Sequence, residues 1–178
     1  MENIGLKETV GAIRSDLKKH GANSFWASFR TYCFNPSFRL ILNYRIGRFY
    51  IQKRSPVFKL LVRYYAYKQV VRRSCQISYR ADIGQRVFFP HPLVIVIGEY
   101  VKIGDDVSIW HGVTLGSHGR KEMNCEYPVI LNRVRLYAGS KVLGAVRVGN
   151  DAVIGASAVV NIDVPDASVA VGIPARIL

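Results

Sequence analysis

The chain of 178 residues carries 25 Lys and Arg against 12 Asp and Glu, a formal net charge of +13, and 49% of its residues are hydrophobic. This composition is ordinary for a folded protein and excludes a disordered chain. No apolar run approaches the roughly 20 residues that span a bilayer. The N-terminus has no basic-then-apolar signal pattern, and the cysteines, Cys33, Cys75 and Cys125, are too scattered for a disulfide framework. We therefore expect a cytoplasmic protein.

The positive charge lies almost entirely in the first part of the chain. Residues 1–74 carry 15 Lys and Arg and 3 Asp and Glu, whereas residues 75–178 carry 10 and 9. Between Phe38 and Ser74 there are ten basic residues and no acidic one. We predict two domains on this basis, a basic α-helical region over residues 1–74 and a second domain over residues 75–178.

Helical patterns fill the basic region. A helix is expected from about Ile4 to Lys19, with Gly21-Ala22-Asn23 ending it. Asn35-Pro36 is a helix break followed by Ser37 as a capping residue, and Ser55-Pro56 combines a capping serine with a proline at the first helical position. Two further helices are therefore expected to begin at these places. After the second start an apolar face recurs at helical spacing: Val57, Leu60, Leu61, Tyr64, Tyr67 and Val71.

Three roles are open for this basic region. A helical cap or oligomerisation element is the favoured interpretation. A surface that docks on an anionic membrane leaflet is the alternative, because basic amphipathic helices rich in Tyr and Phe suit such an interface. Nucleic acid is not expected as a partner, since no recognised binding motif accompanies the charge.

The second region is a repeat of six residues. Large apolar residues return at every sixth position, often followed by Gly: Ile77, Ile83, Phe89, Ile97, Ile103, Ile109, Leu115, Ile130, Leu136, Val142, Val148, Ile154 and Val160. A period of six excludes an α-helix, whose repeat is about 3.6 residues. It predicts short strands joined by tight turns, three to a coil of about 18 residues, stacked into a prism of parallel strands.

Two segments of the repeat resemble the hexapeptide-repeat acetyltransferases. They are VKIGDDVSIWHGVTLG at residues 101–116 and VPDASVAVGIPAR at residues 164–176. Over residues 38–178 the chain is most similar to serine acetyltransferases and to the colanic-acid type of O-acetyltransferase from capsule and exopolysaccharide clusters. The resemblance implies a mainly β fold, a left-handed parallel β-helix preceded by an α-helical N-terminal region. It also implies an acyltransferase with acetyl-CoA as donor, and a homotrimer with active sites between neighbouring prisms.

The repeat is first interrupted beside Pro90-His91-Pro92. Ile97 follows Phe89 by eight positions, so two residues are inserted here. The catalytic histidine of the family occupies this place, and the resemblance therefore makes His91 the general base. An imidazole of near-neutral pKa can take the proton from a hydroxyl as its oxygen attacks a thioester.

His111 follows His91 by 20 residues, which is one coil plus the two inserted positions. This spacing places both side chains on one face of adjacent coils, roughly 4.8 Å apart along the prism. We predict His111 as a second catalytic residue that orients His91 or binds substrate. A stacked ladder without a chemical role is the alternative.

The second interruption is a polar loop from Ser117 to Pro128. In the family this loop lines the acetyl-CoA and acceptor site, and the donor runs along the strands beyond it. The resemblance implies these acetyl-CoA positions: Gly116, Ser117, Ala138, Gly139, Lys141, Ala156 and Arg176. Small residues permit close approach, and Lys141 and Arg176 are candidate phosphate ligands. Coil geometry by itself also accounts for the glycines and alanines.

The residues implied for the acceptor differ from those of serine acetyltransferases. Those enzymes have Asp where this chain has Gln76, and Arg-His where it has Glu126 and Tyr127. An arginine would clamp the carboxylate of serine, whereas Glu126 would repel it. We therefore expect a sugar hydroxyl as acceptor, within bacterial surface polysaccharide synthesis. The alternatives are serine or another small metabolite as acceptor, and a non-catalytic trimeric scaffold.

No metal is expected. Zinc would need His91, His111 and His118 to converge, and their spacing does not match the carbonic anhydrase-like relatives of the family.

Because Gln76 replaces the Asp of serine acetyltransferases, another group would have to orient His91. The candidates are a backbone carbonyl, His111 and Glu126.

Overall fold

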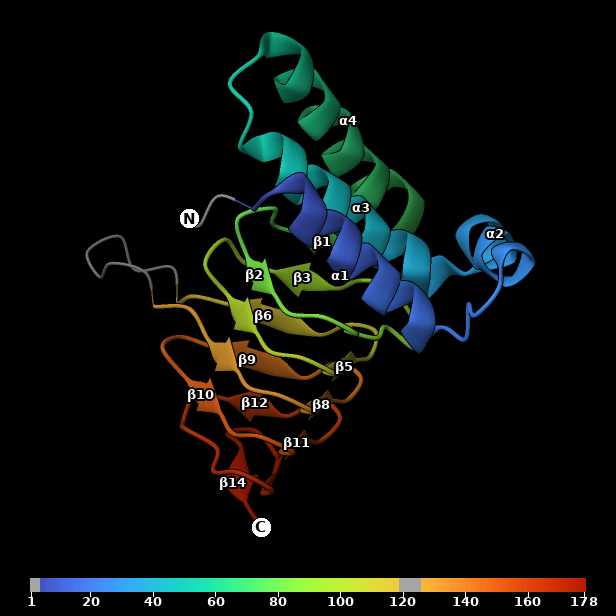
Figure 1. Cartoon of the computed structure of the whole chain (residues 1–178). Helices are drawn as coiled ribbons and strands as arrows, with labels where there is room; N and C mark the ends of the chain where they lie inside the picture. The colour runs from blue at the N-terminus through green and yellow to red at the C-terminus, as the bar shows by residue number, and fades with distance from the viewer. Residues whose placement is uncertain (1–3, 119–125) are drawn as a thin grey trace.

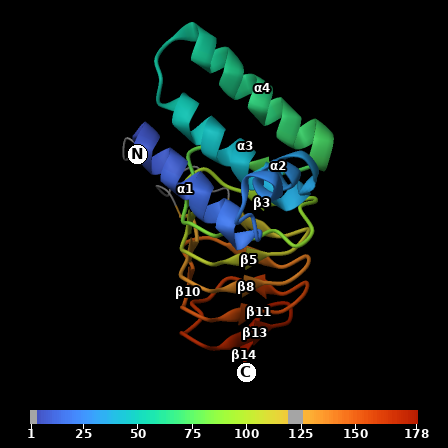
Figure 2. The same ribbon diagram turned by 45° about the vertical axis from the view of Figure 1, so that its right-hand side comes forward.

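A computed structural model describes residues 4–118 and 126–178; Cys125 and the middle of the expected polar loop lie outside these residues. Four helices come first along the chain (Figure 1): α1 (Leu6–Lys19), α2 (Phe25–Phe34), α3 (Pro36–Ile51) and α4 (Pro56–Arg73). Helices α1, α3 and α4 lie at one end of a stack of strands, and α2 projects to the side (Figures 1 and 2).

Side-chain caps mark the starts of α2 and α3. Asn35 caps α3, since its side chain accepts a hydrogen bond from Phe38 N at 3.0 Å. Pro56 occupies the first turn of α4, as the sequence predicts, although the Ser55 side chain makes no capping hydrogen bond. Helix α3 begins at Pro36, so the expected cap Ser37 lies inside the helix and Asn35 takes the capping place. Helix α2 is not anticipated by the sequence analysis, although Ser24 caps it in the usual way.

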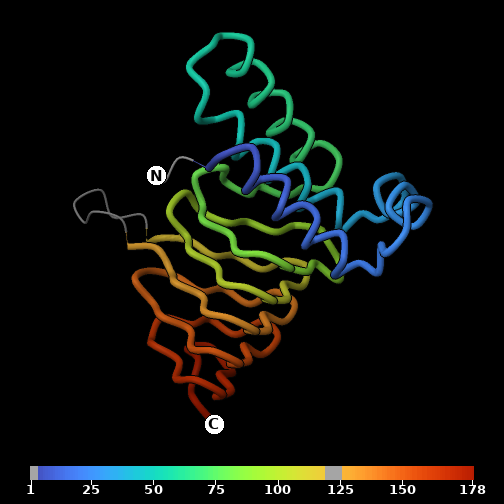
Figure 3. The backbone as a smooth tube through the Cα atoms, viewed as in Figure 1, coloured from blue at the N-terminus to red at the C-terminus, as the bar shows by residue number. Residues whose placement is uncertain are grey.

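The strands stack as regular coils around a buried axis (Figure 3). They are β1 (Gln76–Ile77), β2 (Asp82–Ile83), β3 (Val96–Ile97), β4 (Lys102–Ile103), β5 (Ser108–Ile109), β6 (Thr114–Gly116), β7 (Val129–Ile130), β8 (Arg135–Leu136), β9 (Lys141–Leu143), β10 (Arg147–Val148), β11 (Val153–Ile154), β12 (Val159–Val160), β13 (Val169–Val171) and β14 (Arg176–Ile177). Three sheets form the faces, in the orders β1-β3-β6-β9-β12, β10-β7-β4-β2 and β14-β13-β11-β8-β5. All pairings between strands are parallel except that of β13 with β14. The predicted left-handed parallel β-helix is confirmed.

The register reproduces both interruptions of the repeat. Val96 pairs with Thr114, 18 residues later, which is one regular coil. Gln76 pairs with Val96 after 20 residues, and Thr114 pairs with Lys141 after 27. The extra residues therefore leave the prism as bends and loops while the sixth-position side chains stay inside.

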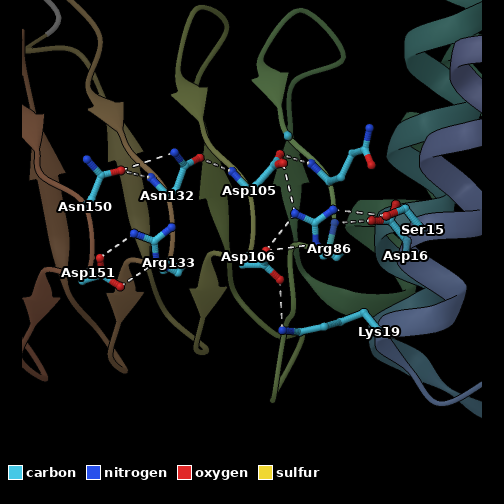
Figure 4. Close-up of polar contacts among 12 residues, drawn as sticks. Ser15, Asp16, Lys19, Arg86, Asp105, Asp106, Asn132, Arg133, Asn150 and Asp151 are labelled. Carbon is cyan, nitrogen blue, oxygen red and sulfur yellow. Dashed lines mark hydrogen bonds and ion pairs between the residues drawn. The ribbon is translucent and has the colours of Figure 1, made fainter.

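One corner of the prism carries a ladder of polar side chains (Figure 4). Asp105 accepts a hydrogen bond from Gln85 N at 2.7 Å, Asn132 from Asp105 N at 2.8 Å, and Asn150 from Asn132 N at 3.2 Å. Each side chain thus satisfies a backbone N–H of the preceding coil, where the tight turn leaves it without a strand partner.

The open end of the prism is covered by α3. Tyr44 is 1% exposed, and its hydroxyl donates to Ala81 O at 2.7 Å and accepts from Ile83 N at 3.2 Å. One side chain therefore satisfies two backbone groups of the first coil. Burial raises the pKa of Tyr44, so the hydroxyl stays protonated and keeps its donor role.

A buried ion pair continues this contact. Arg45 binds Asp16 of α1 with Nε 3.0 Å from Oδ2, and both side chains are at most 8% exposed. The guanidinium also donates to Ile83 O at 2.6 Å and to Gly84 O, while Asp16 accepts from Arg86 N at 2.8 Å. Helices α1 and α3 are thereby joined to each other and to the first coil.

Helix α4 lies on the outer side of α3 (Figure 2), and its predicted apolar face does not pack on the core of its own chain. Members of that face are between 52% and 68% exposed: Val57, Leu60, Tyr64, Tyr67 and Val71. The buried residue of α4 is Gln69, whose amide accepts from Ile77 N at 3.0 Å and donates to Ile77 O at 3.3 Å. Helices and coils share one core cluster, and the division into two domains stays a prediction.

The contact of Tyr44 with the first coil yields a stability prediction. In Tyr44→Phe, Ala81 O and Ile83 N remain buried without their partner, so the free energy of unfolding should fall by about 1–3 kcal/mol. Urea unfolding followed by circular dichroism measures this loss. Tyr64→Phe on the exposed side of α4 is the matched control and should change stability little; an equal loss in both variants would contradict the capping role.

His20 yields a pH prediction. Its half-buried ring packs between Phe38 and Phe88, with centroids 5.8 and 5.4 Å away, and its Nε2 is buried without a hydrogen-bond partner. Burial lowers the pKa of His20, and the carboxylate of Asp16 opposes this shift only in part. As the pH falls, His20 therefore binds a proton in the unfolded chain more readily than in the folded chain. The free energy of unfolding should decrease as the pH falls below about 6.5.

The measurement is urea unfolding at pH 7.5 and at pH 5.5. The drop in stability between the two pH values should be smaller in His20→Gln than in the unmodified chain. His118→Gln, at an exposed histidine, should leave the drop unchanged. Equal drops in all three proteins would show that His20 does not carry this pH dependence.

Candidate active site

His91 lies in the bend that the two inserted residues create before β3. The bend is tied to its neighbours on both sides, because Val94 N donates to Arg73 O at 3.3 Å and Gly112 N donates to Leu93 O at 3.0 Å. The imidazole itself is exposed to solvent. A general base at this place has a firmly held backbone and open access for a substrate.

His111 is the neighbour of His91 on the next coil. The two ring centroids are 5.7 Å apart and the planes meet at 66°. Within residues 4–118 and 126–178, no hydrogen bond reaches either imidazole, so ring contact is the interaction they share. The expected juxtaposition is thus present in the structure, and the catalytic roles of His91 and His111 stay predictions.

The same corner continues through the residues expected to meet the donor. Gly139 N donates to His111 O at 2.9 Å, and Ser157 N donates to Ala138 O at 2.8 Å. Gly139 has φ +73°, and a Cβ there would lie 3.2 Å from Ser157 Oγ, so a larger residue would be strained. Ala156 is exposed beside Ser157. A column of small residues therefore runs along the prism from the two histidines.

The other donor positions lie on the sheet beside this corner or beyond it. Gly116 in β6 and Lys141 in β9 belong to paired strands, and the ammonium of Lys141 donates to Gly139 O at 3.1 Å. Ser117 follows β6 and is half-buried. Arg176 is exposed in β14, the last strand. Lys141 therefore contacts the column, Gly116 and Ser117 lie at the end of β6 away from His111, and Arg176 lies at the far end of the prism.

Two of the residues expected to bind the acceptor line a cavity that His91 does not line. Gln76 and Tyr127 line a separate cavity of about 470 Å³ over β1 and β3. The Tyr127 ring packs edge-on against Tyr100, with centroids 5.5 Å apart. Glu126 is half-buried before it.

A different set of side chains shares a cavity with His91. This cavity of about 530 Å³ is lined by Arg39 of α3, by Arg72 and Arg73 of α4, and by the bend from Pro90 to Leu93. Sequence analysis missed this grouping, because it treated these arginines only as part of the basic surface. The charge run was the available signal, but it does not say which of its members face the histidine.

Neither a metal site nor a membrane span is found in the part of the chain that the structure describes. In the described ranges no three His, Cys, Asp or Glu side chains are grouped so that they could hold a metal ion. None of the four helices is both long and apolar enough to cross a bilayer, as far as the described residues go.

Comparison with known proteins places the chain in a family. No family model matches it. A serine acetyltransferase of Helicobacter pylori is 43% identical over 143 residues, which are 79% of this chain and 80% of that protein. One from Mycobacterium tuberculosis is 37% identical over 147 residues, 83% of this chain and 62% of that protein.

Solved structures agree with these relatives. A serine acetyltransferase in complex with cysteine has a TM-score of 0.84 and 31% identity, and the match covers 97% of this chain and 66% of that one. A serine acetyltransferase in complex with CoA has a TM-score of 0.81 and 30% identity, over 97% and 71% of the two chains.

These relatives correct one expectation. The prediction of a sugar hydroxyl as acceptor in polysaccharide synthesis is wrong, and the closer likeness to colanic-acid O-acetyltransferases is not supported, because the matched relatives are serine acetyltransferases. The argument depended on Gln76, Glu126 and Tyr127. The relatives show that Gln76, Glu126 and Tyr127 do not by themselves identify the acceptor.

The predicted enzyme class, an acyltransferase with acetyl-CoA as donor, is confirmed by the same relatives. The identity and coverage of the Helicobacter pylori protein carry the assignment, and the structural match over nearly the whole chain agrees with it. The chain belongs to the serine acetyltransferase family.

Proposed function

We propose that the chain transfers the acetyl group of acetyl-CoA to the hydroxyl of serine or of a similar small metabolite. The observation that carries the proposal is the pair His91 and His111, exposed together at a bend that interrupts the coils of a serine acetyltransferase fold. Serine is named as acceptor for the relatives, and the same hydroxyl chemistry suits the site here.

His91 is the general base in this proposal. It takes the proton of the acceptor hydroxyl as the oxygen attacks the thioester carbonyl, which forms the new C–O bond and a tetrahedral oxyanion. Backbone N–H groups near Gly116 are candidate donors to that oxyanion. Collapse breaks the C–S bond, and the imidazolium of His91 returns its proton to the departing CoA thiolate. No acyl-enzyme is needed, so both substrates are bound together.

Acetyl-CoA fits the column of small residues along the corner. Ala138, Gly139 and Ala156 leave backbone groups within reach of an extended pantetheine arm, and Lys141 stands exposed beside them for an anionic group. Gly116 and Ser117, at and directly after the end of β6, are the remaining candidate donor-binding residues on this sheet. Arg176 is retained as a candidate for the nucleotide phosphates of the donor.

A homotrimer completes the proposed site. His91 and the column of small residues are open to solvent in the single chain, and a neighbouring prism packed on this corner would enclose both substrates and exclude water. Gln76, Glu126 and Tyr127 would then act from a neighbouring subunit or on a distant part of the acceptor. Two domains are part of the same proposal, a basic α-helical region over residues 1–74 and a β-helix domain over residues 75–178.

Peripheral contact with an anionic membrane stays a prediction. The outward side of α4 combines exposed Tyr64 and Tyr67 with Arg63, a composition that suits an acidic interface. The comparisons offer nothing in its favour, and the proposed catalysis does not need it.

Removal of His91 tests the mechanism. His91→Ala should lower kcat by roughly 10²–10⁴, the usual contribution of a general base, because no other group at the bend takes the hydroxyl proton. The affinity for acetyl-CoA, measured by calorimetry, should change little. His111→Ala is the comparison and should lose less activity; full activity in His91→Ala would remove the proposed base.

The acceptor is tested by the release of CoA thiol in the presence of L-serine. A kcat/KM of about 10⁴ M⁻¹s⁻¹ or more would lie in the usual range of enzymes acting on their own substrates. A neutral oligosaccharide is the matched acceptor and should give only background thiol release. Thiol release that does not rise with L-serine would exclude serine and leave another small hydroxylated metabolite.

A further inference from the structure

Three arginines from two helices line the cavity that holds His91. Arg39 comes from the first turn of α3, and Arg72 and Arg73 come from the last turn of α4. The helices bring them together although Arg39 and Arg72 are 33 positions apart in the sequence. We call Arg39, Arg72 and Arg73 the arginine cluster.

The positive charge of the arginine cluster is not balanced by nearby carboxylates. Some arginines of the chain have carboxylate partners, as Arg45 has in Asp16 and Arg133 has in Asp151. Among the residues that the structure describes, no carboxylate lies within ion-pair distance of Arg39, Arg72 or Arg73. Three positive charges therefore line one cavity without a carboxylate beside them among the described residues.

Two of the guanidinium groups are half-buried with donors to spare. Arg39 donates one hydrogen bond, from Nη1 to Cys33 O at 3.3 Å. Arg73 has its Nε buried, and no hydrogen-bond partner for it lies among the described residues. Burial lowers the pKa of Arg73, and the charges of Arg39 and Arg72 lower it further. A buried donor without a partner is costly, so the cluster has the features of a site completed by an anion.

A purely structural role explains only part of the cluster. Arg72 and Arg73 suit the C-terminal end of α4, where cations interact favourably with the helix dipole. Arg39 stands in the first turn of α3, where the dipole opposes a cation and favours an anion. The dipoles therefore account for two of the arginines and not for their convergence with the third.

We propose that Arg39, Arg72 and Arg73 bind an oxyanion, a carboxylate or a phosphate, that the acceptor carries near the hydroxyl presented to His91. Guanidinium groups match such anions with paired N–H donors, and a cavity of about 530 Å³ has room for a small polar metabolite. The assignment to the acceptor rests on the proposed function, whereas the binding of an oxyanion beside His91 does not.

The test uses the full chain, inorganic phosphate as probe and the imidazole signal of His91 in ¹H–¹³C NMR spectra. That signal is assigned as the one that disappears in His91→Ala. Phosphate should shift it in a saturable way, and Arg39→Gln and Arg72→Gln should each weaken the binding by roughly tenfold or more. Arg63→Gln is the matched control, because it removes the same charge from an exposed position of α4 outside the cavity.

Each alternative has its own outcome. No shift of the His91 signal, or equal binding in Arg72→Gln and Arg63→Gln, overturns the site, and thermal unfolding of Arg39→Gln shows whether that variant is folded. Acetate in place of phosphate separates a carboxylate preference from a phosphate preference. If Arg72→Gln raises the KM for acetyl-CoA and leaves the KM for the acceptor unchanged, the anion belongs to the donor and the acceptor assignment fails. Since phosphate binding needs no turnover, a missing acetyltransferase activity would not affect the result on the site.

Discussion

The buried contact between α3 and the first coil is the constraint on which the rest of the structure depends. A stack of parallel coils has an open end whose backbone groups and apolar interior would otherwise face water. Tyr44 and Arg45 close that end by hydrogen bonds to Ala81, Ile83 and Gly84, and Asp16 balances the arginine charge. Removal of either charge from this pair would leave the other buried without a partner, which costs more than the pair itself contributes.

The same contact determines what surrounds the candidate base. Because α3 is held over the first coil and α4 packs on α3, the chain enters β1 directly after Arg73, and its carbonyl meets the bend at Val94. The basic helices therefore contribute side chains to the cavity of His91 rather than forming only an outer surface. The helices that cover the open end of the prism thus also form one wall of the His91 cavity.

The prism contributes the other wall through its regular spacing. Each coil of 18 residues returns to the same corner, so His91, His111, Gly139 and Ser157 follow one another along it although they are far apart in sequence. Insertions change the local shape without disturbing the core, because the added residues leave the prism between buried positions. Chemistry can therefore vary at the bends while the fold stays constant.

The six-residue period by itself determined the β-helix, the two interruptions and the neighbouring places of His91 and His111, because a strict repeat translates residue number directly into position on a coil. Ser55-Pro56 likewise determined the start of α4, and Asn35-Pro36-Ser37 determined that of α3 to within two residues. Tertiary structure alone decided which arginines face His91, that the apolar side of α4 is exposed, and that Gln76 and Tyr127 line another cavity. Those contacts join elements without a shared period. Their geometry depends on how the helices pack on the first coil, and no local pattern in the sequence encodes that packing.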